Sequence, residues 1–424
     1  MTGRELAYRG LTQIEEKGGF SNLVLKELLR EADKKDKGLI TALVYGVTRE
    51  RSYLDYQIGR FCDLKKTPSS LLRLLRMGAF QLCRMDKIPP SAAVNETVKL
   101  AKKLVPKGAG CCNGVLRKIA EQGELLPSEE DRDFFLSVQY SMPLWLVKKW
   151  KKQFGEEELE PLLSSFSKSS NSVLRVNLKK STPEAIKEEI PELEETPFSD
   201  AFLLPKNSNV EGLPAWKEGR VTVMQLSSMA ACREGHVTPG MKVCDMCAAP
   251  GGKTMYLADL MEHQGELVAW ELHPHRTELL KKNLERMGIT MVKTACRDSA
   301  VYDEQYQDYF DVVVLDAPCS GLGVIGRKPE LKWQDPDLMK ELLPIQKSLL
   351  QNAGAYVKSG GTLLYSTCTL NKAENEGMVL EFLEQHPEFS LDERMGMKNL
   401  LPHRDGMGGF FMARMKKSGA KQHG

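Results

Sequence analysis

The chain has 424 residues, of which 42% are hydrophobic and 27% are charged. A chain of this length exceeds one ordinary hydrophobic core, so we expect two or three domains. No stretch approaches the ~20 apolar residues that a membrane-spanning helix requires. The first residues also lack the apolar segment of a signal peptide, and we expect a cytoplasmic protein without membrane contacts.

Ten cysteines are scattered along the chain, and without a secretory signal we expect them to be reduced thiols. Cys244 and Cys247 form a C-x-x-C pair, but neither a second pair nor two histidines at ligand spacing accompany it. No metal site is therefore expected. A redox pair is the less favoured alternative, because Cys244 falls inside a predicted strand.

The charge is nearly balanced overall, with 59 Lys and Arg against 57 Asp and Glu, but it is unevenly distributed. Residues 1–120 contain 23 basic and 12 acidic residues, which leaves 36 basic and 45 acidic residues for the rest of the chain. A basic first domain on an acidic remainder indicates a polyanionic partner, most simply a nucleic acid.

Residues 5–120 read as consecutive amphipathic helices. Apolar residues recur at helical spacing in residues 23–29, 39–47 and 71–77, and Pro68 and Pro89 mark helix entries. No β-type alternation interrupts this pattern, so we expect an all-α domain over residues 1–125.

Four stretches of this domain resemble the NusB-like RNA-binding helical domain: residues 45–49 (YGVTR), 76–82 (RMGAFQL), 93–98 (AVNETV) and 113–117 (NGVLR). The resemblance implies a module that docks RNA or protein. Its expected phosphate contacts are basic residues: Arg49, Arg51, Arg76, Lys102, Lys103, Lys107, Arg117 and Lys118.

The middle of the chain has mixed character. Residues 122–131 are polar and acidic and contain Pro and Gly, as a linker does. Residues 142–150 begin a helical stretch after a proline, and residues 172–177 alternate like a strand. We expect a linker and a small α/β subdomain over residues 126–228.

Strands and helices alternate through the last part of the chain. The expected strands are residues 243–245, 267–271, 291–294, 312–316 and 362–366. This rhythm predicts an α/β fold, a Rossmann-like, doubly wound and mostly parallel sheet over residues 229–417.

The turn after the first of these strands, residues 245–254 (DMCAAPGGKT), is rich in small residues. Glycine lets the backbone approach a ligand closely, and the helix that follows presents unpaired N–H groups. A turn in this position is where an open α/β sheet places its cofactor.

Acidic residues follow later strands at what we expect to be the same sheet edge. Glu271 stands where a carboxylate binds ribose hydroxyls, Asp298 could accept from an adenine amino group, and Asp316 ends the fourth strand. Two cysteines join them, Cys319 in a Pro/Gly loop and Cys368 after the last strand. Cysteine thiolates serve as nucleophiles where a reversible covalent adduct is needed.

Residues 247–253 (CAAPGGK), 316–321 (DAPCSG) and 366–369 (STCT) closely resemble the motifs of S-adenosylmethionine-dependent RNA cytosine-5 methyltransferases. Residues 327–330 (RKPE) and 409–414 (GFFMAR) also fit that pattern, and the resemblance spans roughly residues 140–416. Residues 145–225 resemble the RNA-facing segment before the catalytic core. Together with the NusB-like domain, the chain resembles the RsmB/NOP family members that modify 16S rRNA.

The resemblance implies roles for individual residues. Cys368 is the expected nucleophile and Cys319 the residue that releases the product, with Asp316 on the N3/N4 edge of cytosine and Lys253 beside it. DNA cytosine methyltransferases instead use a Pro-Cys nucleophile, so the residues alone leave the two cysteine roles open. The expected S-adenosylmethionine-binding residues are Cys247, Ala248, Ala249, Pro250, Gly251, Gly252, Lys253, Glu271, Asp298 and Asp316.

Two positions depart from the family pattern: Gln225 is followed by Leu226 rather than Asp, and Glu271 stands in a common Asp position. Two alternatives remain open at this point. One is the same chemistry on tRNA or another rRNA, and the other is a non-catalytic NusB-type RNA-binding factor. No feature of the sequence demands an oligomer, and none identifies the target nucleotide.

Overall fold

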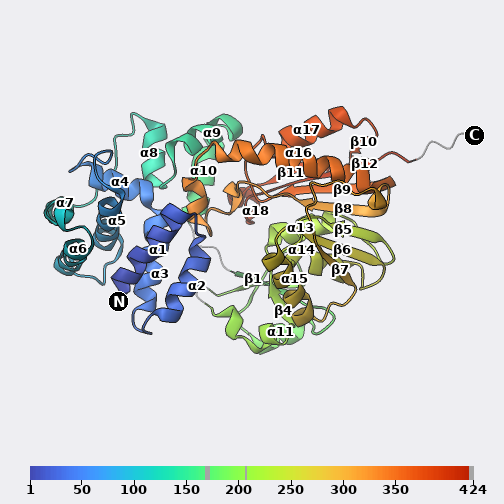
Figure 1. Ribbon diagram of the computed structural model, residues 1–424, viewed down its shortest axis with the longest axis horizontal. Helices are drawn as coiled ribbons and strands as arrows, with labels where there is room; N and C mark the ends of the chain where they lie inside the picture. The colour runs from blue at the N-terminus through green and yellow to red at the C-terminus, as the bar shows by residue number, and fades with distance from the viewer. Residues whose placement is uncertain (168–171, 206–207, 420–424) are drawn as a thin grey trace, which may run out of the picture. The chain divides into compact units, whose positions relative to one another are not determined.

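The chain forms two compact units (Figure 1). The computed structural model describes residues 1–167, 172–205 and 208–419. A helical unit comprises Met1–Lys168 with Ile325–Gln334, and a sheet unit comprises Ser169–Val324 with Asp335–Gly424. The boundaries expected after residues 125 and 228 do not coincide with this division, so the three-domain organisation stays a prediction.

The main sheet of the sheet unit has eight strands: β5 (Lys242–Asp245), β6 (Glu266–Glu271), β7 (Val292–Cys296), β8 (Phe310–Asp316), β9 (Val357–Thr367), β10 (Phe389–Leu391), β11 (Met397–Leu400) and β12 (Phe410–Lys417). Their order is β10-β12-β9-β8-β5-β6-β7, with β11 on β12. The five strands expected from the sequence are confirmed and pair in parallel. The sequence did not predict the three C-terminal strands, which pair antiparallel.

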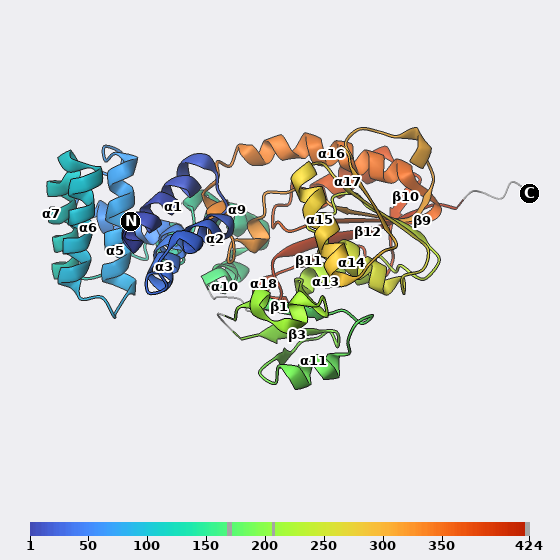
Figure 2. The same ribbon diagram turned by 60° about the horizontal axis from the view of Figure 1, so that its bottom comes forward.

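Helices cover both faces of this sheet, which is why its central strands are almost continuously apolar (Figure 2). Val243 and Val312 belong to the core on one face, packed by α13 (Leu226–Glu234), α14 (Gly252–Leu260) and α15 (Pro274–Met287). Their chain neighbours Cys244 and Val313 belong to the core on the other face, packed by α16 (Leu338–Tyr356) and α17 (Glu376–Gln385). The predicted doubly wound α/β fold is confirmed, and the strand order changes direction at β5.

A smaller antiparallel sheet precedes the main one in the chain. It consists of β1 (Ser172–Val176), β2 (Glu194–Glu195), β3 (Ala201–Leu204) and β4 (Val221–Val223), in the order β2-β3-β1-β4. The short helices α11 (Pro183–Glu189) and α12 (Pro214–Lys217) accompany it, and α18 (Pro402–Asp405) precedes β12. The small α/β layer expected in this part of the chain is therefore present.

The helical unit contains α1 (Gly3–Lys17), α2 (Ser21–Glu31), α3 (Lys37–Arg49), α4 (Arg51–Gly59), α5 (Ser69–Arg84), α6 (Pro90–Leu104), α7 (Ala109–Gln122), α8 (Arg132–Gln139), α9 (Leu144–Phe154) and α10 (Glu156–Ser167). The apolar stripes of the first seven helices pack into one core, as their spacing predicts. No helix in the described ranges is long and apolar enough to cross a membrane.

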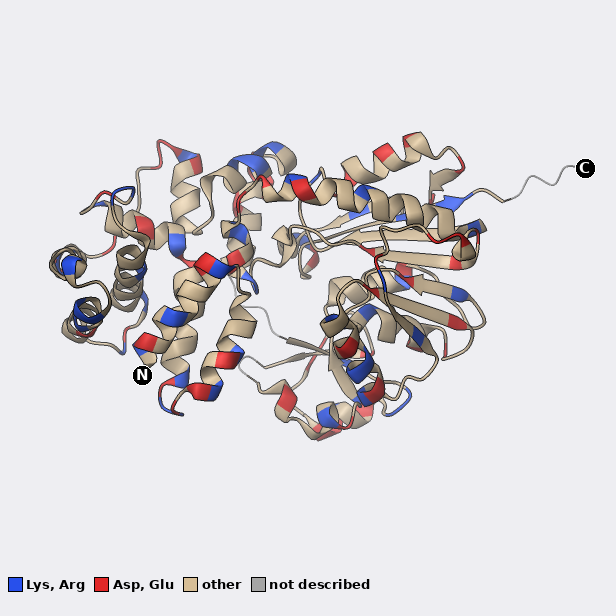
Figure 3. Ribbon diagram, in the orientation of Figure 1, with Lys and Arg blue, Asp and Glu red and all other residues tan. Residues whose placement is uncertain are grey.

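Basic residues on α6 and α7 are exposed, and Figure 3 shows few acidic residues between them. The exposed members of the predicted RNA-contacting set are Lys102, Lys103, Lys107, Arg117 and Lys118, whereas Arg49 and Arg51 are half-buried. Lys103 donates to Glu5 at 2.6 Å, and the other four exposed side chains remain available to a polyanion.

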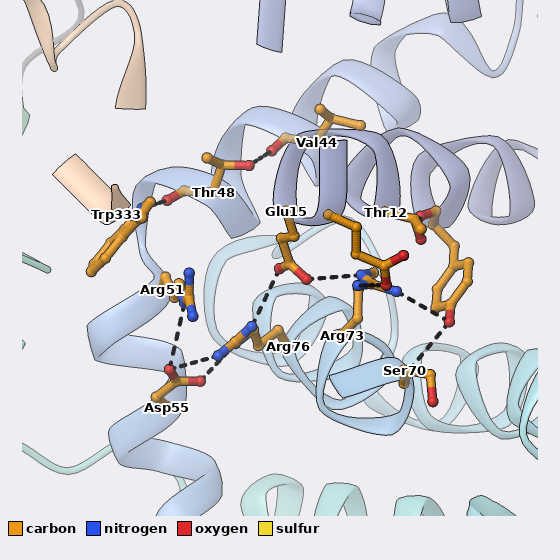
Figure 4. Close-up of polar contacts among 12 residues, drawn as sticks. Thr12, Glu15, Val44, Thr48, Arg51, Asp55, Ser70, Arg73, Arg76 and Trp333 are labelled. Carbon is orange, nitrogen blue, oxygen red and sulfur yellow. Dashed lines mark hydrogen bonds and ion pairs between the residues drawn. The ribbon is translucent and has the colours of Figure 1, made fainter. Parts of the chain in front are cut away.

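Two arginines of α5 are instead buried inside the helical unit (Figure 4). Arg76 donates to both carboxylate oxygens of Asp55 at 2.7 and 2.8 Å, and Arg73 donates to Glu15 at 2.9 Å. Only 4% of Arg76 is exposed. A buried guanidinium requires such partners, so Arg76 holds helices together, and the prediction that it contacts RNA phosphate is wrong.

The inserted segment, Ile325–Gln334, completes the helical unit by capping α3. The indole Nε1 of Trp333 donates to the carbonyl of Thr48 at 2.6 Å (Figure 4), and Nζ of Lys332 donates to the carbonyl of Arg49 at 2.8 Å. Carbonyls in the last turn of a helix have no partner within the helix. The segment, which contains the turn Pro329–Trp333, therefore supplies donors that α3 lacks.

Glu330 fastens the same segment to α2. Its carboxylate accepts from the backbone N–H of Ser21 at 3.1 Å and from the Ser21 hydroxyl at 2.7 Å. The RKPE motif thus contributes a buried glutamate to the helical unit, because Glu330 is 8% exposed.

Lys332 gives the helical unit a dependence on pH. Burial lowers the pKa of its ammonium group from 10.5 to about 7. Between these values the unfolded chain binds more protons than the folded one, so stability rises with pH, and below pH 7 the penalty is fully present. We expect the free energy of unfolding of the wild type to rise by ~2 kcal/mol from pH 7 to 9 relative to Lys332→Met. Denaturant unfolding at both pH values measures this difference, and parallel pH profiles would contradict it.

Candidate active site

The candidate site residues of the sheet unit lie at or just after the carboxyl ends of its parallel strands. Asp245, Glu271 and Asp316 end β5, β6 and β8, and Cys368 follows β9 directly. Carboxyl ends of parallel strands meet at one edge of a sheet, and β5, where the strand order changes direction, is the usual ligand position. The fold therefore brings the predicted turn, acids and cysteines to one edge.

The small-residue turn is shaped by two glycines. Gly251 has φ +107°, a conformation that favours glycine, and a Cβ there would lie 2.7 Å from Leu280. At Gly252, where α14 begins, a Cβ would meet nothing closer than 4.0 Å. Ala248 and Ala249 behind the turn are buried, whereas Cys247 is partly exposed and Pro250 is exposed. The turn thus leaves space in front of the N-terminus of α14. The unpaired N–H groups there can bind an anionic group of a ligand, such as a carboxylate.

Two acidic residues flank the turn. Glu271 accepts from the His273 backbone and from Arg276, both at 3.2 Å, and Arg276 also donates to the Ala249 carbonyl at 2.7 Å. These contacts fix the carboxylate of Glu271 beside the turn. Asp298 is exposed and accepts from the Ala300 backbone at 2.9 Å.

Asp245 is a polar residue of this edge that sequence reasoning did not single out. Thr254 donates to its Oδ2 at 2.6 Å, but Oδ1 is buried and has no hydrogen-bond partner within the described ranges. Burial raises the pKa of this carboxyl to about 6. An unpartnered buried oxygen next to the turn fits a ligand that brings its own donor. The signal was present, since Asp245 opens the turn.

Asp316 is held by two donors. Lys253 Nζ donates to its Oδ2 at 2.7 Å, and the Ser366 hydroxyl donates to its Oδ1 at 2.8 Å. Burial is the largest influence and acts against the charged form of Lys253, but the charge and hydrogen bond of Asp316, together with Cys232 and Asp245, outweigh it, so the pKa of Lys253 is raised. The pair is therefore ionic, and the Lys253 ammonium also lies 5.4 Å from the centre of the Phe410 ring. Sequence reasoning missed Ser366, although it lies in the STCT motif.

The two cysteines lie against each other, with their Sγ atoms 3.3 Å apart. The pKa of Cys319 is raised well above 9, chiefly by its hydrogen bond with Cys368 and next by burial. A thiol that is hydrogen-bonded to a neighbouring sulfur and buried resists ionisation, so Cys319 is held in its protonated form. Within the described residues, no group of three or more His, Cys, Asp or Glu side chains is arranged to hold a metal ion.

Gly323 joins the loops that carry the two cysteines. Its N–H donates to the Cys368 carbonyl and its carbonyl accepts from Gly409, both at 3.0 Å. A Cβ at Gly323 would lie 2.0 Å from the Gly409 carbonyl oxygen and 2.8 Å from that of Cys368. Only glycine permits this approach, which gives the GFFMAR motif a structural role.

Comparisons with known proteins identify the family of this chain. Residues 236–416 match the family described as 16S rRNA methyltransferase RsmB/F, and residues 1–121 match the NusB family. The probable ribosomal RNA small subunit methyltransferase B of Bacillus subtilis is 34% identical to this chain. The alignment covers 98% of this chain and 99% of the relative's chain. The chain belongs to the RsmB/F family of rRNA methyltransferases. The ribosomal RNA small subunit methyltransferase B of Citrobacter koseri, 31% identical over 98% of this chain and 99% of its own, is also similar.

Solved structures show the same fold. The crystal structure of PH0851 covers 97% of both chains with a TM-score of 0.82 and 27% identity. A methyltransferase homologue from Pyrococcus horikoshii covers 69% of this chain and 100% of its own, with a TM-score of 0.60 and 26% identity. The predicted family is confirmed, and so is S-adenosylmethionine as its methyl donor.

Gly323→Ala tests the close approach of the two cysteine loops in this RsmB/F methyltransferase. Its Cβ must displace backbone, so we expect methyl transfer to rRNA to fall by about 10²-fold. Methyl incorporation from labelled S-adenosylmethionine measures the loss. Gly110→Ala on α7, where nothing lies within 4 Å of the added Cβ, is the control and should retain activity. Equal activity of the two variants would contradict the expectation.

Proposed function

We propose that this protein transfers a methyl group from S-adenosylmethionine to C5 of a cytidine in 16S rRNA, through a covalent adduct on Cys368. The observation that carries the proposal is the pair of sulfurs 3.3 Å apart at the sheet edge that also holds the Lys253–Asp316 pair. Other methyl transfers do not need two adjacent thiols beside a carboxylate.

Cytosine dictates the first step. C5 is a poor nucleophile until a thiolate adds to C6 and moves the electrons of the C5=C6 bond onto C5. Cys368 supplies this thiolate, and the Cys319 S–H, 3.3 Å away, stabilises it. The bound sulfonium supplies an electrophilic methyl group. The turn at 247–252, with Asp245, Glu271 and Asp298, would hold the donor.

Asp316 binds the N3/N4 edge of the base and stabilises the charge that develops there. Its two oxygens are oriented by Lys253 and Ser366, which fixes the carboxylate without an adjustment during the reaction. Lys253 thereby acts on the base through Asp316.

Cys319 completes the cycle. Once Cys368 is bound to C6 it is no longer a thiolate. The hydrogen bond with Cys368, which is the main reason for the raised pKa of Cys319, is then lost. Cys319 then releases its proton to solvent and takes the proton from C5. The C5=C6 bond re-forms, the bond between C6 and sulfur breaks, and Cys368 leaves as the thiolate. The net products include one proton, and the starting pair is restored.

In this proposal the helical unit binds the RNA substrate. The exposed Lys and Arg of α6 and α7 suit phosphate contacts, and the target base must leave its stack to reach the sheet edge. Assignment to 16S rRNA rests on the names of the family and of its small-subunit relatives.

The test is mass spectrometry of the protein with S-adenosylmethionine and 16S rRNA fragments that contain 5-fluorocytidine. Fluorine at C5 blocks the final proton removal, so we expect a stalled adduct that maps to Cys368. An adduct on Cys319 would reverse the two cysteine roles, and adducts on tRNA or 23S rRNA alone would change the substrate. No adduct and no methyl transfer on any RNA would overturn the proposal.

Cys368→Ala is the matched variant for normal RNA. It should bind S-adenosylmethionine as the wild type does, while methyl transfer falls by ~10³-fold or more. Full activity of this variant would contradict the mechanism. Cys62→Ala, at a partly exposed cysteine of the helical unit, is the control for loss of a thiol.

A further inference from the structure

A buried carboxylate outside the mechanism above holds the loop that carries Cys319. Glu374 lies between β9 and α17 and is 0% exposed. Its Oε2 accepts from the Ser320 backbone N–H at 2.9 Å and from Gln346 at 3.0 Å. Its Oε1 accepts from the Ser320 hydroxyl at 2.5 Å and from Asn371 at 2.6 Å.

These hydrogen bonds fix the backbone on both sides of Cys319. Ser320, the next residue, gives both its N–H and its hydroxyl to Glu374. Pro318, the preceding residue, has its carbonyl bound by the same Gln346 amide at 2.8 Å. The Ser320 hydroxyl also contacts Thr369 at 2.7 Å, on the loop that carries Cys368. The carboxylate is thus the centre of the network that sets where the Cys319 sulfur lies.

Every group that contacts the Glu374 side chain is a hydrogen-bond donor, so both oxygens of this side chain must act as acceptors. A carboxylate offers only acceptors, and its four partners all donate. Burying a charge is costly unless such donors compensate it, and a loop of this kind needs no buried charge merely to pack. A function for the charge is the better explanation.

We propose that Glu374 is a positioning residue for the second half of the reaction: it fixes the Cys319 sulfur through Ser320 so that it reaches the C5 proton of the adduct. This inference rests on the proposed function, since it assigns to Cys319 the release step. Glu374 does not touch the base, and the first half of the reaction, attack by Cys368, does not require it.

Glu374→Gln is the sharpest variant, because the amide has the same shape but replaces one acceptor by an NH₂ group that faces two donors. With ordinary cytidine RNA we expect the adduct on Cys368 to form at the wild-type rate, within ~3-fold, and its release to slow by about 10- to 100-fold. The variant therefore accumulates a denaturation-resistant RNA complex that contains the methylated base. Quenched single-turnover reactions, followed by gel and mass spectrometry, separate the two rates.

Glu376→Gln is the matched control. It makes the same chemical change two residues along the chain, where Glu376 accepts from Asn399 at 2.6 Å, and it should release product normally. Ser320→Ala, which keeps the carboxylate and removes one contact, should give the same accumulation to a smaller extent. This second variant keeps the inference testable should Glu374→Gln unfold, as thermal melting will show.

The outcomes separate the two proposals. No wild-type adduct with 5-fluorocytidine RNA overturns the proposed function and this inference together. A wild-type adduct, with normal release in folded Glu374→Gln, overturns the inference alone. Equal loss of both adduct formation and release in Glu374→Gln and Ser320→Ala also overturns it, because the network would then serve the whole site rather than Cys319.

Discussion

The parallel pairing of β8 with β9, with Asp316 opposite Ser366, sets the distances of the site. From this pair, three residues lead to Cys319 and two lead to Cys368, so both sulfurs arrive at the same place above the sheet edge. A slip of one residue would turn the side chains of β9 to the opposite face. The valines and leucines buried on both faces of these strands prevent such a slip, and thus the hydrophobic core fixes the geometry of the polar site.

The site combines a half-buried pair of opposite charges with a fully buried carboxylate oxygen that has no partner within the described ranges. Lys253 and Asp316 neutralise each other, whereas Oδ1 of Asp245 has no partner within the described ranges. A paired charge serves to orient a neighbour, while an unpaired buried acceptor is costly in the free protein and favours the arrival of a donor. The proposed mechanism uses this distinction: the Lys253–Asp316 pair orients the base, and Asp245 lies on the cofactor side of the edge.

Much of this arrangement could be predicted from the sequence, because it depends on local order. Strand ends, a small-residue turn and short motifs placed Asp316, Cys319 and Cys368 together. Other features depend on contacts between residues far apart in the chain. A count of basic residues does not distinguish buried Arg76 from exposed Lys102. Likewise, no local pattern shows that Gly323 must accommodate the carbonyl of Gly409, or that the last strands run antiparallel.

The inserted segment has a consequence for synthesis on the ribosome. Trp333 is 285 residues away in the chain from Thr48, whose carbonyl it satisfies. At ~5–20 residues per second, the end of α3 therefore lacks its cap for about 15–60 s after it is made. Within that interval four of the eight strands of the main sheet, β5 to β8, are also synthesised. The core of the first seven helices contains no residue of this segment, so these helices can pack before the cap of α3 exists, and the helical unit gains its last piece only later in synthesis.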